Sequence, residues 1–132
     1  MKSQIMYIEH KSDQNDRGNA WIGQVDFSKS GQTVYFNNLA FKKMKGTHYA
    51  YSEYSNYYDL EHRQAYWISG IKKNGQDRHW AGGGKIKIDR KIISEYLNLV
   101  EFEELDDMQF EIVDIEKTDK SKFYDLENSL TQ

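Results

Sequence analysis

The sequence predicts a β-rich α+β protein: an antiparallel curled sheet or small barrel of about six or seven short strands, with one helix near residues 90–100. Short runs of β-branched and aromatic residues alternate with polar ones along most of the chain, as they do in half-buried strands. Glycine and asparagine turn signals separate these runs at hairpin distances. One stretch shows the apolar spacing of an amphipathic helix.

The first half of the chain supplies the strands up to residue 42. Residues 5–9 form a β-branched and aromatic run, and the polar residues 11–19 indicate a loop. Residues 20–36 predict a hairpin, because alternating strand residues flank a Ser-Lys-Ser-Gly turn. Residues 37–38 indicate a second turn, which leads into a short strand at 39–42.

A second hairpin is predicted in the middle of the chain. Residues 65–71 have strand composition and are followed by Asn74 and Gly75, a pair typical of tight hairpin turns. Residues 78–80 would form the return strand, and lysine alternates with isoleucine in the next strand at 85–88.

The predicted helix begins after Asp89, a residue type favoured at helix N-caps. Apolar residues follow at positions 92, 93, 96, 97 and 100, which place them on one helical face. The acidic stretch 101–107 indicates a turn, and 108–115 is a final strand. Phe123, Leu126 and Leu130 have the spacing of a short terminal helix, which the predicted fold class does not include.

Length and composition fit one domain. The chain has 132 residues, 38% hydrophobic and 30% charged, enough to bury a core without covalent cross-links. We expect a single domain over 1–132, with a β-rich core and helix at 5–100 and an acidic strand and tail at 101–132. Cysteine is absent and no apolar run approaches the ~18 residues of a membrane span, so we expect a cytoplasmic protein.

Charge is divided unevenly along the chain. Residues 1–41 are neutral overall, residues 42–91 carry eleven basic against five acidic side chains, and residues 92–132 carry three basic against twelve acidic. The net charge of −3 is therefore a cancellation between a basic middle and an acidic end. This division indicates a charged partner or a contact between the two regions; in the second case stability would depend strongly on salt.

Catalytic and metal-binding patterns are weak. No two of the four histidines have metal-ligand spacing. Asp77 and His79 would face the same side of a strand, where they could orient a general base in a small hydrolase, but no nucleophile motif accompanies them. We therefore expect no catalytic residue, no metal and no cofactor.

Tyrosine is concentrated in residues 49–58. The five rings belong to Tyr49, Tyr51, Tyr54, Tyr57 and Tyr58, interspersed with serine and asparagine. This mixture is typical of binding loops, because tyrosine offers a large rigid surface with a hydrogen-bonding tip. The alternative is that several of these rings fill the core of a small sheet.

Aromatic and basic residues alternate in the predicted hairpin 66–80. They are Trp67, Lys72, Lys73, Arg78 and Trp80. Rings that stack on bases, together with cations that attract phosphates, are typical of single-stranded RNA or DNA binding. The same set also fits a hairpin with its rings inside and its cations outside. Nucleic-acid binding is supported neither by a named motif nor by the total charge, which is negative.

The acidic end offers a surface for a cationic protein. Eight acidic residues fall within positions 101–116, and the expected steering charges are Glu103, Glu104, Asp106 and Asp107. Such a cluster accelerates association with a cationic partner. As a solvated face, the same cluster would need no functional explanation.

Three blocks carry a resemblance. Residues 21–31 read WIGQVDFSKSG, residues 56–59 NYYD and residues 66–80 YWISGIKKNGQDRHW. The chain resembles, over residues 5 to about 97, a group of small bacterial proteins of unassigned function with similar blocks in this order. Some of them carry the name of a thiamine-dependent isoprenoid-pathway synthase, which this chain is too short to be. The resemblance implies a shared domain and transfers no catalytic residue.

These observations favour a non-catalytic protein-binding domain, and within that class an immunity- or antitoxin-like inhibitor of a bacterial toxin. The expected contact residues are the five tyrosines and the four steering charges, and the expected partner is a protein such as a cationic toxin, with no membrane involved. A single-stranded nucleic-acid-binding module is the alternative, and a small hydrolase is the third interpretation.

Overall fold

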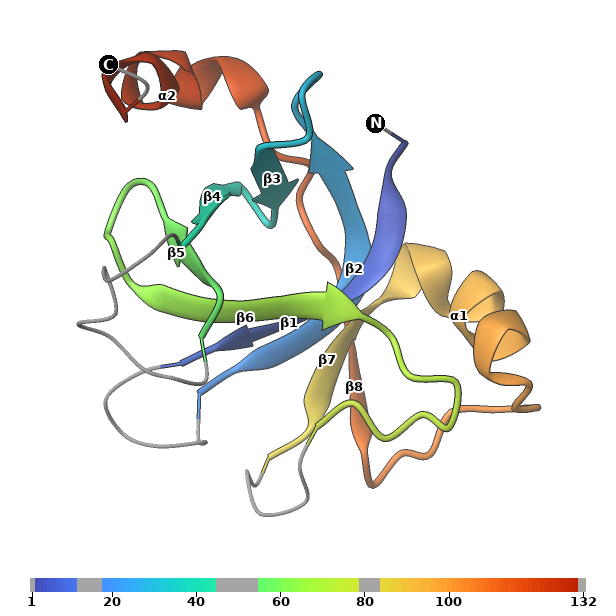
Figure 1. Ribbon diagram of the computed structural model, residues 1–132. Helices are drawn as coiled ribbons and strands as arrows, with labels where there is room; N and C mark the ends of the chain where they lie inside the picture. The colour runs from blue at the N-terminus through green and yellow to red at the C-terminus, as the bar shows by residue number, and fades with distance from the viewer. Residues whose placement is uncertain (1, 12–17, 45–54, 79–83, 131–132) are drawn as a thin grey trace.

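Six strands of the protein close into an antiparallel barrel (Figure 1). The computed structural model describes residues 2–11, 18–44, 55–78 and 84–130. The barrel strands are β1 (Gln4–His10), β2 (Ala20–Phe27), β3 (Thr33–Phe36), β4 (Leu39–Lys43), β5 (Tyr57–Asp59) and β6 (Ala65–Gly70). Each pairs with the strand before and after it in the chain, and β1 also pairs with β6, so the sheet closes.

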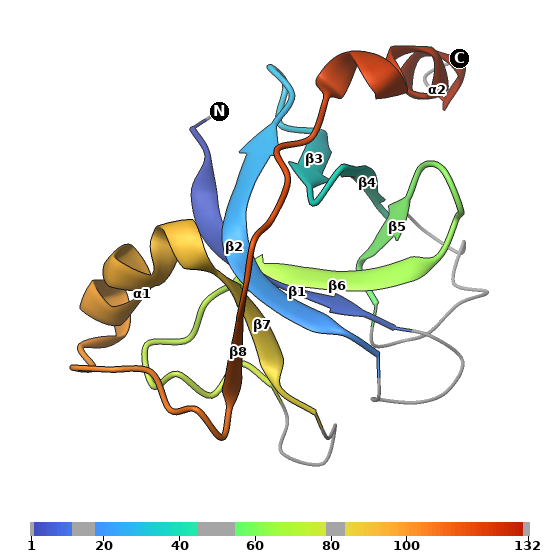
Figure 2. The ribbon, with the colours of Figure 1, turned by 180° about the vertical axis from the view of Figure 1, so that it is seen from behind.

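Two further strands extend the sheet from β2. β7 (Ile86–Asp89) pairs in parallel with residues 20–22 of β2, and β8 (Phe110–Val113) pairs in parallel with β7. Parallel neighbours need a long crossover, which here contains α1 (Ile93–Val100). Figure 2 shows α1 beside β7 and β8, and α2 (Tyr124–Leu130) at the end of the molecule where the N-terminus lies.

Alternation along the strands separates two apolar layers. Successive residues of a barrel strand point alternately inward and outward: Ile8 and its partner Ile68 point into the barrel, and Tyr7 and its partner Ile22 point outward. The barrel interior contains Ile8, Val25, Val34, Phe36, Phe41, Tyr66 and Ile68, with Ile115 packed against them. The outer layer, under α1, contains Tyr7, Ala20, Ile22, Ile86, Ile88, Ile92, Tyr96, Val100 and Phe110.

Asparagine and aspartate build the tight turns in a chain that has no proline. Asn37 and Asn38 have φ values of 51° and 62°, the left-handed pair that a two-residue hairpin turn between β3 and β4 requires. In the β5–β6 turn, the carboxylate of Asp59 accepts from the N–H groups of His62 and Gln64, both at 2.7 Å. Arg63 is left-handed there, with φ of 60°.

The predicted fold class is confirmed in part: the protein is β-rich and its six barrel strands form a closed antiparallel barrel, whereas β7 and β8 pair in parallel, which was not predicted. The prediction of one helix is wrong, because α2 forms as well. Phe123, which immediately precedes α2, is buried together with Tyr35, Ala40 and Leu60. This contact anchors the start of α2 to the outside of the barrel. The strand β5 was not predicted, since its residues face two different apolar layers and show no polar alternation.

The predicted hairpin at 66–80 is also wrong in the described part. β1 pairs with one edge of β6, and the other edge is taken by β5 at residues 65–66 and by the Asn56 side chain, which bonds both backbone groups of Ile68. No described residue forms a return strand there. Residues 71–78 instead form turns, in which Lys72 donates its N–H to Asp77 Oδ1 at 2.7 Å. His79 and Trp80 lie outside the described residues.

Candidate functional site

The acidic segment, residues 101–116, runs from the end of α1 through β8. It holds eight aspartates and glutamates and no lysine or arginine. The helix ends because Glu101 takes a left-handed φ of 61°, and the Phe102 N–H donates to the Leu97 carbonyl at 3.0 Å. The chain therefore turns away from α1, and all its carboxylate-bearing residues from Glu101 to Glu116 are exposed.

Asp106 differs from the other three predicted steering charges. Its Oδ1 accepts from the Met108 N–H at 2.8 Å, and its carbonyl accepts from the N–H groups of residues 109 and 110, so it holds the turn before β8. Glu103, Glu104 and Asp107 are exposed and form no ion pair within the described part of the chain. Their charge is available to a partner.

Large apolar side chains are exposed on the same stretch of chain. Leu99 is 49% exposed, Phe102 45%, Met108 83% and Ile112 45%. A single exposed apolar residue is common, but apolar side chains set among carboxylates give a surface both affinity and electrostatic selectivity. These four residues were not among the predicted site residues, although apolar residues within or next to an acidic run were the available signal.

The basic middle and the acidic end of the chain do touch. β7 and β8 bring them together, and beyond this pairing Arg90 Nε lies 3.1 Å from Asp114 Oδ1. Lys91 Nζ donates to the carbonyl of Ile115 at 3.4 Å. The Arg90 and Asp114 side chains are 62% and 75% exposed, so this ion pair contributes little to stability.

The described tyrosines of the predicted binding loop take part in packing. Tyr57 lies against the barrel interior, where burial raises its pKa, and Tyr58 packs against the cluster around Phe123. The Arg63 guanidinium lies 5.5 Å from the centre of the Tyr58 ring. Tyr49, Tyr51 and Tyr54 lie outside the described residues, so their role as contact rings stays a prediction.

The predicted nucleic-acid residues are only partly brought together. Trp67 is 37% exposed on β6, with its Nε1 donating to Ser69 Oγ at 3.1 Å, and Lys72 and Lys73 are exposed in the following turn. Arg78 instead points inward and donates from Nη2 to the carbonyl of Gly18 at 2.8 Å. Trp80 lies outside the described residues.

A polar cluster lies between the barrel and α1. Tyr7 donates its hydroxyl to Glu9 Oε1, and burial, followed by this bond, raises the pKa of Tyr7. Asp77 Oδ2 and the Tyr96 hydroxyl are buried and have no hydrogen-bond partner among the described residues. Burial raises the pKa of Asp77, and burial together with the Asp77 charge raises that of Tyr96 to about 12.

The hydrolase interpretation has limited geometric support. Asp77 Oδ1 accepts a hydrogen bond from the Lys72 N–H. His79, the proposed catalytic partner of Asp77, lies outside the described residues. Among the described residues, no group of three or more histidine, aspartate or glutamate side chains is placed to hold a metal ion.

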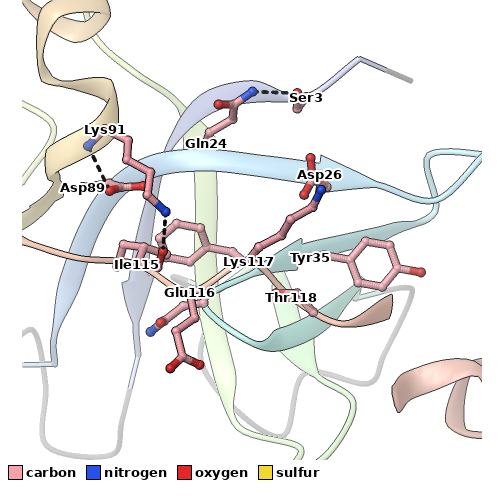
Figure 3. Close-up of a pocket in the computed structure, with 12 residues that line it drawn as sticks. Ser3, Gln24, Asp26, Tyr35, Asp89, Lys91, Ile115, Glu116, Lys117 and Thr118 are labelled. Atoms are coloured by element: carbon pink, nitrogen blue, oxygen red, sulfur yellow. Dashed lines mark hydrogen bonds between the residues drawn. The ribbon is translucent and has the colours of Figure 1, made fainter. Parts of the chain in front are cut away.

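A groove of about 320 Å³ lies where β3 and β7 diverge from β2 (Figure 3). Its wall is mixed in charge, with carboxylates of Asp26, Asp89 and Glu116 and the ammonium groups of Lys91 and Lys117. Figure 3 shows the Lys117 side chain pointing toward Asp26. The remaining lining residues are Ser3, Gln24, Tyr35, Phe36, Asn37, Ile115 and Thr118. Because groups of both charges line the groove, it selects no single class of ligand.

Within the described residues, no helix has both the length and the apolar character needed to cross a membrane. No protein-family model, curated protein or solved structure matches the chain. The resemblance of residues 5 to about 97 to a bacterial group therefore stays a prediction.

Proposed function

We propose that the protein is a non-catalytic protein-binding domain that recognises a cationic protein through its acidic segment. Within that class we propose an immunity- or antitoxin-like inhibitor of a bacterial toxin, acting in the cytoplasm. The observation that carries the proposal is the exposure of Glu103, Glu104 and Asp107, unpaired among the described residues, beside the exposed side chains of Phe102 and Met108.

The two kinds of side chain have separate roles in this proposal. Unpaired carboxylates on one surface attract a cationic partner over about one Debye length and raise the association rate by a factor of about 10 to 1000. Exposed apolar side chains act at short range, where their burial slows dissociation. An inhibitor of a cationic enzyme needs both fast capture and slow release.

Charge neutralisation tests the proposal. The protein is used to capture its partner from the native cell extract, the captured protein is identified, and its association with purified wild type is followed at several salt concentrations. The variant Glu103→Gln/Glu104→Gln/Asp107→Asn keeps the Asp106 turn intact, and we expect it to associate about tenfold more slowly with a flatter salt dependence.

A second variant controls for total charge. Glu61→Gln/Glu95→Gln/Asp125→Asn removes the same number of charges from other exposed positions, and its association should remain close to that of wild type. A captured partner without excess positive charge, or equal association rates for both variants, would contradict the proposal.

Single-stranded nucleic-acid binding is the second candidate, favoured by the exposure of Trp67, Lys72 and Lys73. The inward position of Arg78 removes one of its expected phosphate contacts. If this function is correct, tryptophan fluorescence should respond to oligonucleotides at low salt, and Lys72→Ala/Lys73→Ala should weaken binding and lower its salt dependence.

A further inference from the structure

The sheet has an open edge at β8. Every barrel strand has a neighbour on each side, and β7 lies between β2 and β8. β8 pairs with β7 alone, and no described residue pairs with its other side. Figure 2 shows β8 at the front of the molecule, with α1 to one side. A strand edge without a neighbour presents backbone groups that can pair with another chain.

The hydrogen-bond pattern shows which backbone groups face outward. The Ile86 N–H donates to the Gln109 carbonyl at 2.9 Å, so Gln109 directs its backbone toward β7. Successive residues of a strand direct their backbone groups to opposite sides, and Phe110 and Ile112 therefore direct theirs away from β7. The Phe110 N–H donates back to the Asp106 carbonyl, which leaves the Phe110 carbonyl and both backbone groups of Ile112 at the open edge.

This edge is protected only by acidic charge and by its short length. Natural proteins place charged residues, above all lysine, and also proline or bulges on open edges, and the acidic segment contains neither lysine nor proline. Its charges are all of one sign, with Glu111 exposed on β8 and Asp114 and Glu116 just beyond it. A second copy of the same strand would bring like charges together, whereas a basic strand would find opposite charges along its length.

We propose that the outer edge of β8 accepts an extended, lysine- or arginine-bearing segment of the cationic partner as an added strand. The inference rests on the proposed function and specifies how the partner docks. Main-chain hydrogen bonds to Phe110 and Ile112 would supply affinity, and the surrounding carboxylates would select basic side chains. The 45% exposed Ile112 side chain would be covered by the added strand.

The test uses two substitutions at one position and two synthetic peptides. Ile112→Pro removes the outward N–H without touching the bonds to β7, and Ile112→Ala removes most of the side chain but keeps that N–H. One peptide alternates lysine with valine; the other alternates lysine with proline, so it has the same charge but cannot form a strand ladder. Binding is measured by titration, and protection of the Ile112 amide by hydrogen exchange.

We expect the lysine–valine peptide to bind wild type and Ile112→Ala and to bind Ile112→Pro about tenfold more weakly, since one main-chain hydrogen bond is lost. The lysine–proline peptide should bind at least about tenfold more weakly than the lysine–valine peptide, and the Ile112 amide of wild type should become protected on peptide binding. The last two measurements use unaltered protein, so they hold even where Ile112→Pro disturbs folding.

Failure of this inference and failure of the proposed function are distinguishable. Equal binding of the two peptides, with an unprotected Ile112 amide, overturns strand addition; if Glu103→Gln/Glu104→Gln/Asp107→Asn still weakens the binding, the acidic surface remains the recognition site. Peptide binding that responds neither to this variant nor to salt overturns strand addition by a basic segment and charge recognition together.

Discussion

The ring of Phe102 lies over Gly75, in the space that a side chain at position 75 would occupy. A Cβ on Gly75 would lie 2.6 Å from Phe102 Cε2, and the glycine has a left-handed φ of 73°. This contact joins the start of the acidic segment to the turn that follows β6. The orientation of the proposed binding surface therefore depends on a glycine about a fifth of the chain length earlier in the sequence.

We predict that Gly75→Ala destabilises the protein by about 1 kcal/mol, because alanine is strained at positive φ and its methyl group displaces the Phe102 ring. Gly70→Ala is the matched control, since a Cβ there meets no atom within 4 Å. Urea unfolding of both variants measures the difference. Equal stabilities would show that the Gly75 conformation relaxes without cost.

Tyr96→Phe should leave the free energy of unfolding unchanged or raise it. The buried Tyr96 hydroxyl has no hydrogen-bond partner among the described residues, so its removal ends a desolvation cost. Tyr7→Phe is the contrasting variant, because it removes the donor to Glu9 Oε1 while Lys11 Nζ stays 2.8 Å from Oε2, and a loss of about 1–3 kcal/mol is expected. A clear loss of stability in Tyr96→Phe would instead indicate a bound water on its hydroxyl.

Asp77→Asn should stabilise the protein at pH 7. Burial raises the pKa of Asp77, so the folded state binds its proton more tightly than the unfolded state does. Folding then carries a penalty while the carboxyl is ionised in both states, and the penalty disappears as the pH falls through the raised pKa toward the ordinary aspartate range. Asparagine has no such penalty and still accepts from the Lys72 N–H.

The measurement is the free energy of unfolding of wild type and Asp77→Asn as a function of pH. The two curves should converge as the pH is lowered from neutrality. A difference that is constant with pH, or a variant that is less stable at pH 7, would contradict the prediction.

Asp59→Ala should cost about 2–3 kcal/mol, because two part-buried hydrogen bonds from backbone N–H groups to the buried Asp59 carboxylate are lost together. Glu61→Ala in the same turn should cost less than about 1 kcal/mol. Glu61 Oε1 lies 3.6 Å from Lys122 Nζ, and this ion pair is exposed to solvent, which weakens it. Thermal unfolding of both variants provides the comparison. Similar losses in the two would exclude the assigned role of Asp59.

Asp114→Asn should change stability by less than about 1 kcal/mol, and wild-type stability should vary only weakly with salt. The Arg90–Asp114 pair is exposed on both sides, so water and salt screen it. Unfolding at low and high salt measures this directly. A steep loss of stability with salt would support instead an electrostatic contact of the basic middle with the acidic end that holds the fold together.

The local elements were largely predictable. Alternation, β-branched and aromatic runs and turn residues marked five of the six barrel strands and both added strands, and the apolar spacing after Asp89 marked α1. Asp89 accepts from the Lys91 N–H at 3.1 Å and thereby caps a 3-10 helix, Arg90–Ile92, which leads directly into α1. The strand that was not predicted, β5, has Tyr57 packed against the barrel interior and Tyr58 packed against the cluster around Phe123. Because both faces are covered, β5 lacks the polar alternation that identifies a strand.

The hairpin at 66–80 failed for a different reason. The Asn74-Gly75 pair does form a turn, in which the Gly75 N–H donates to the Lys72 carbonyl at 3.1 Å. The turn itself depends only on neighbouring residues, but a hairpin also needs a free edge of β6 for the return strand. β1 already pairs with one edge of β6, along residues 66–70. The pairing is decided by residues about sixty positions earlier in the chain.

The sequence by itself determined the β-rich class, most of the strands, α1 and the division between a basic middle and an acidic end, because these follow from local alternation, turn residues and composition. Only the tertiary structure decided that the barrel closes through β1 and β6, that Arg78 points inward and that β8 keeps an open edge. These properties depend on which distant strands share backbone hydrogen bonds. That choice is made by the packing of the whole chain, and no short stretch of residues contains it.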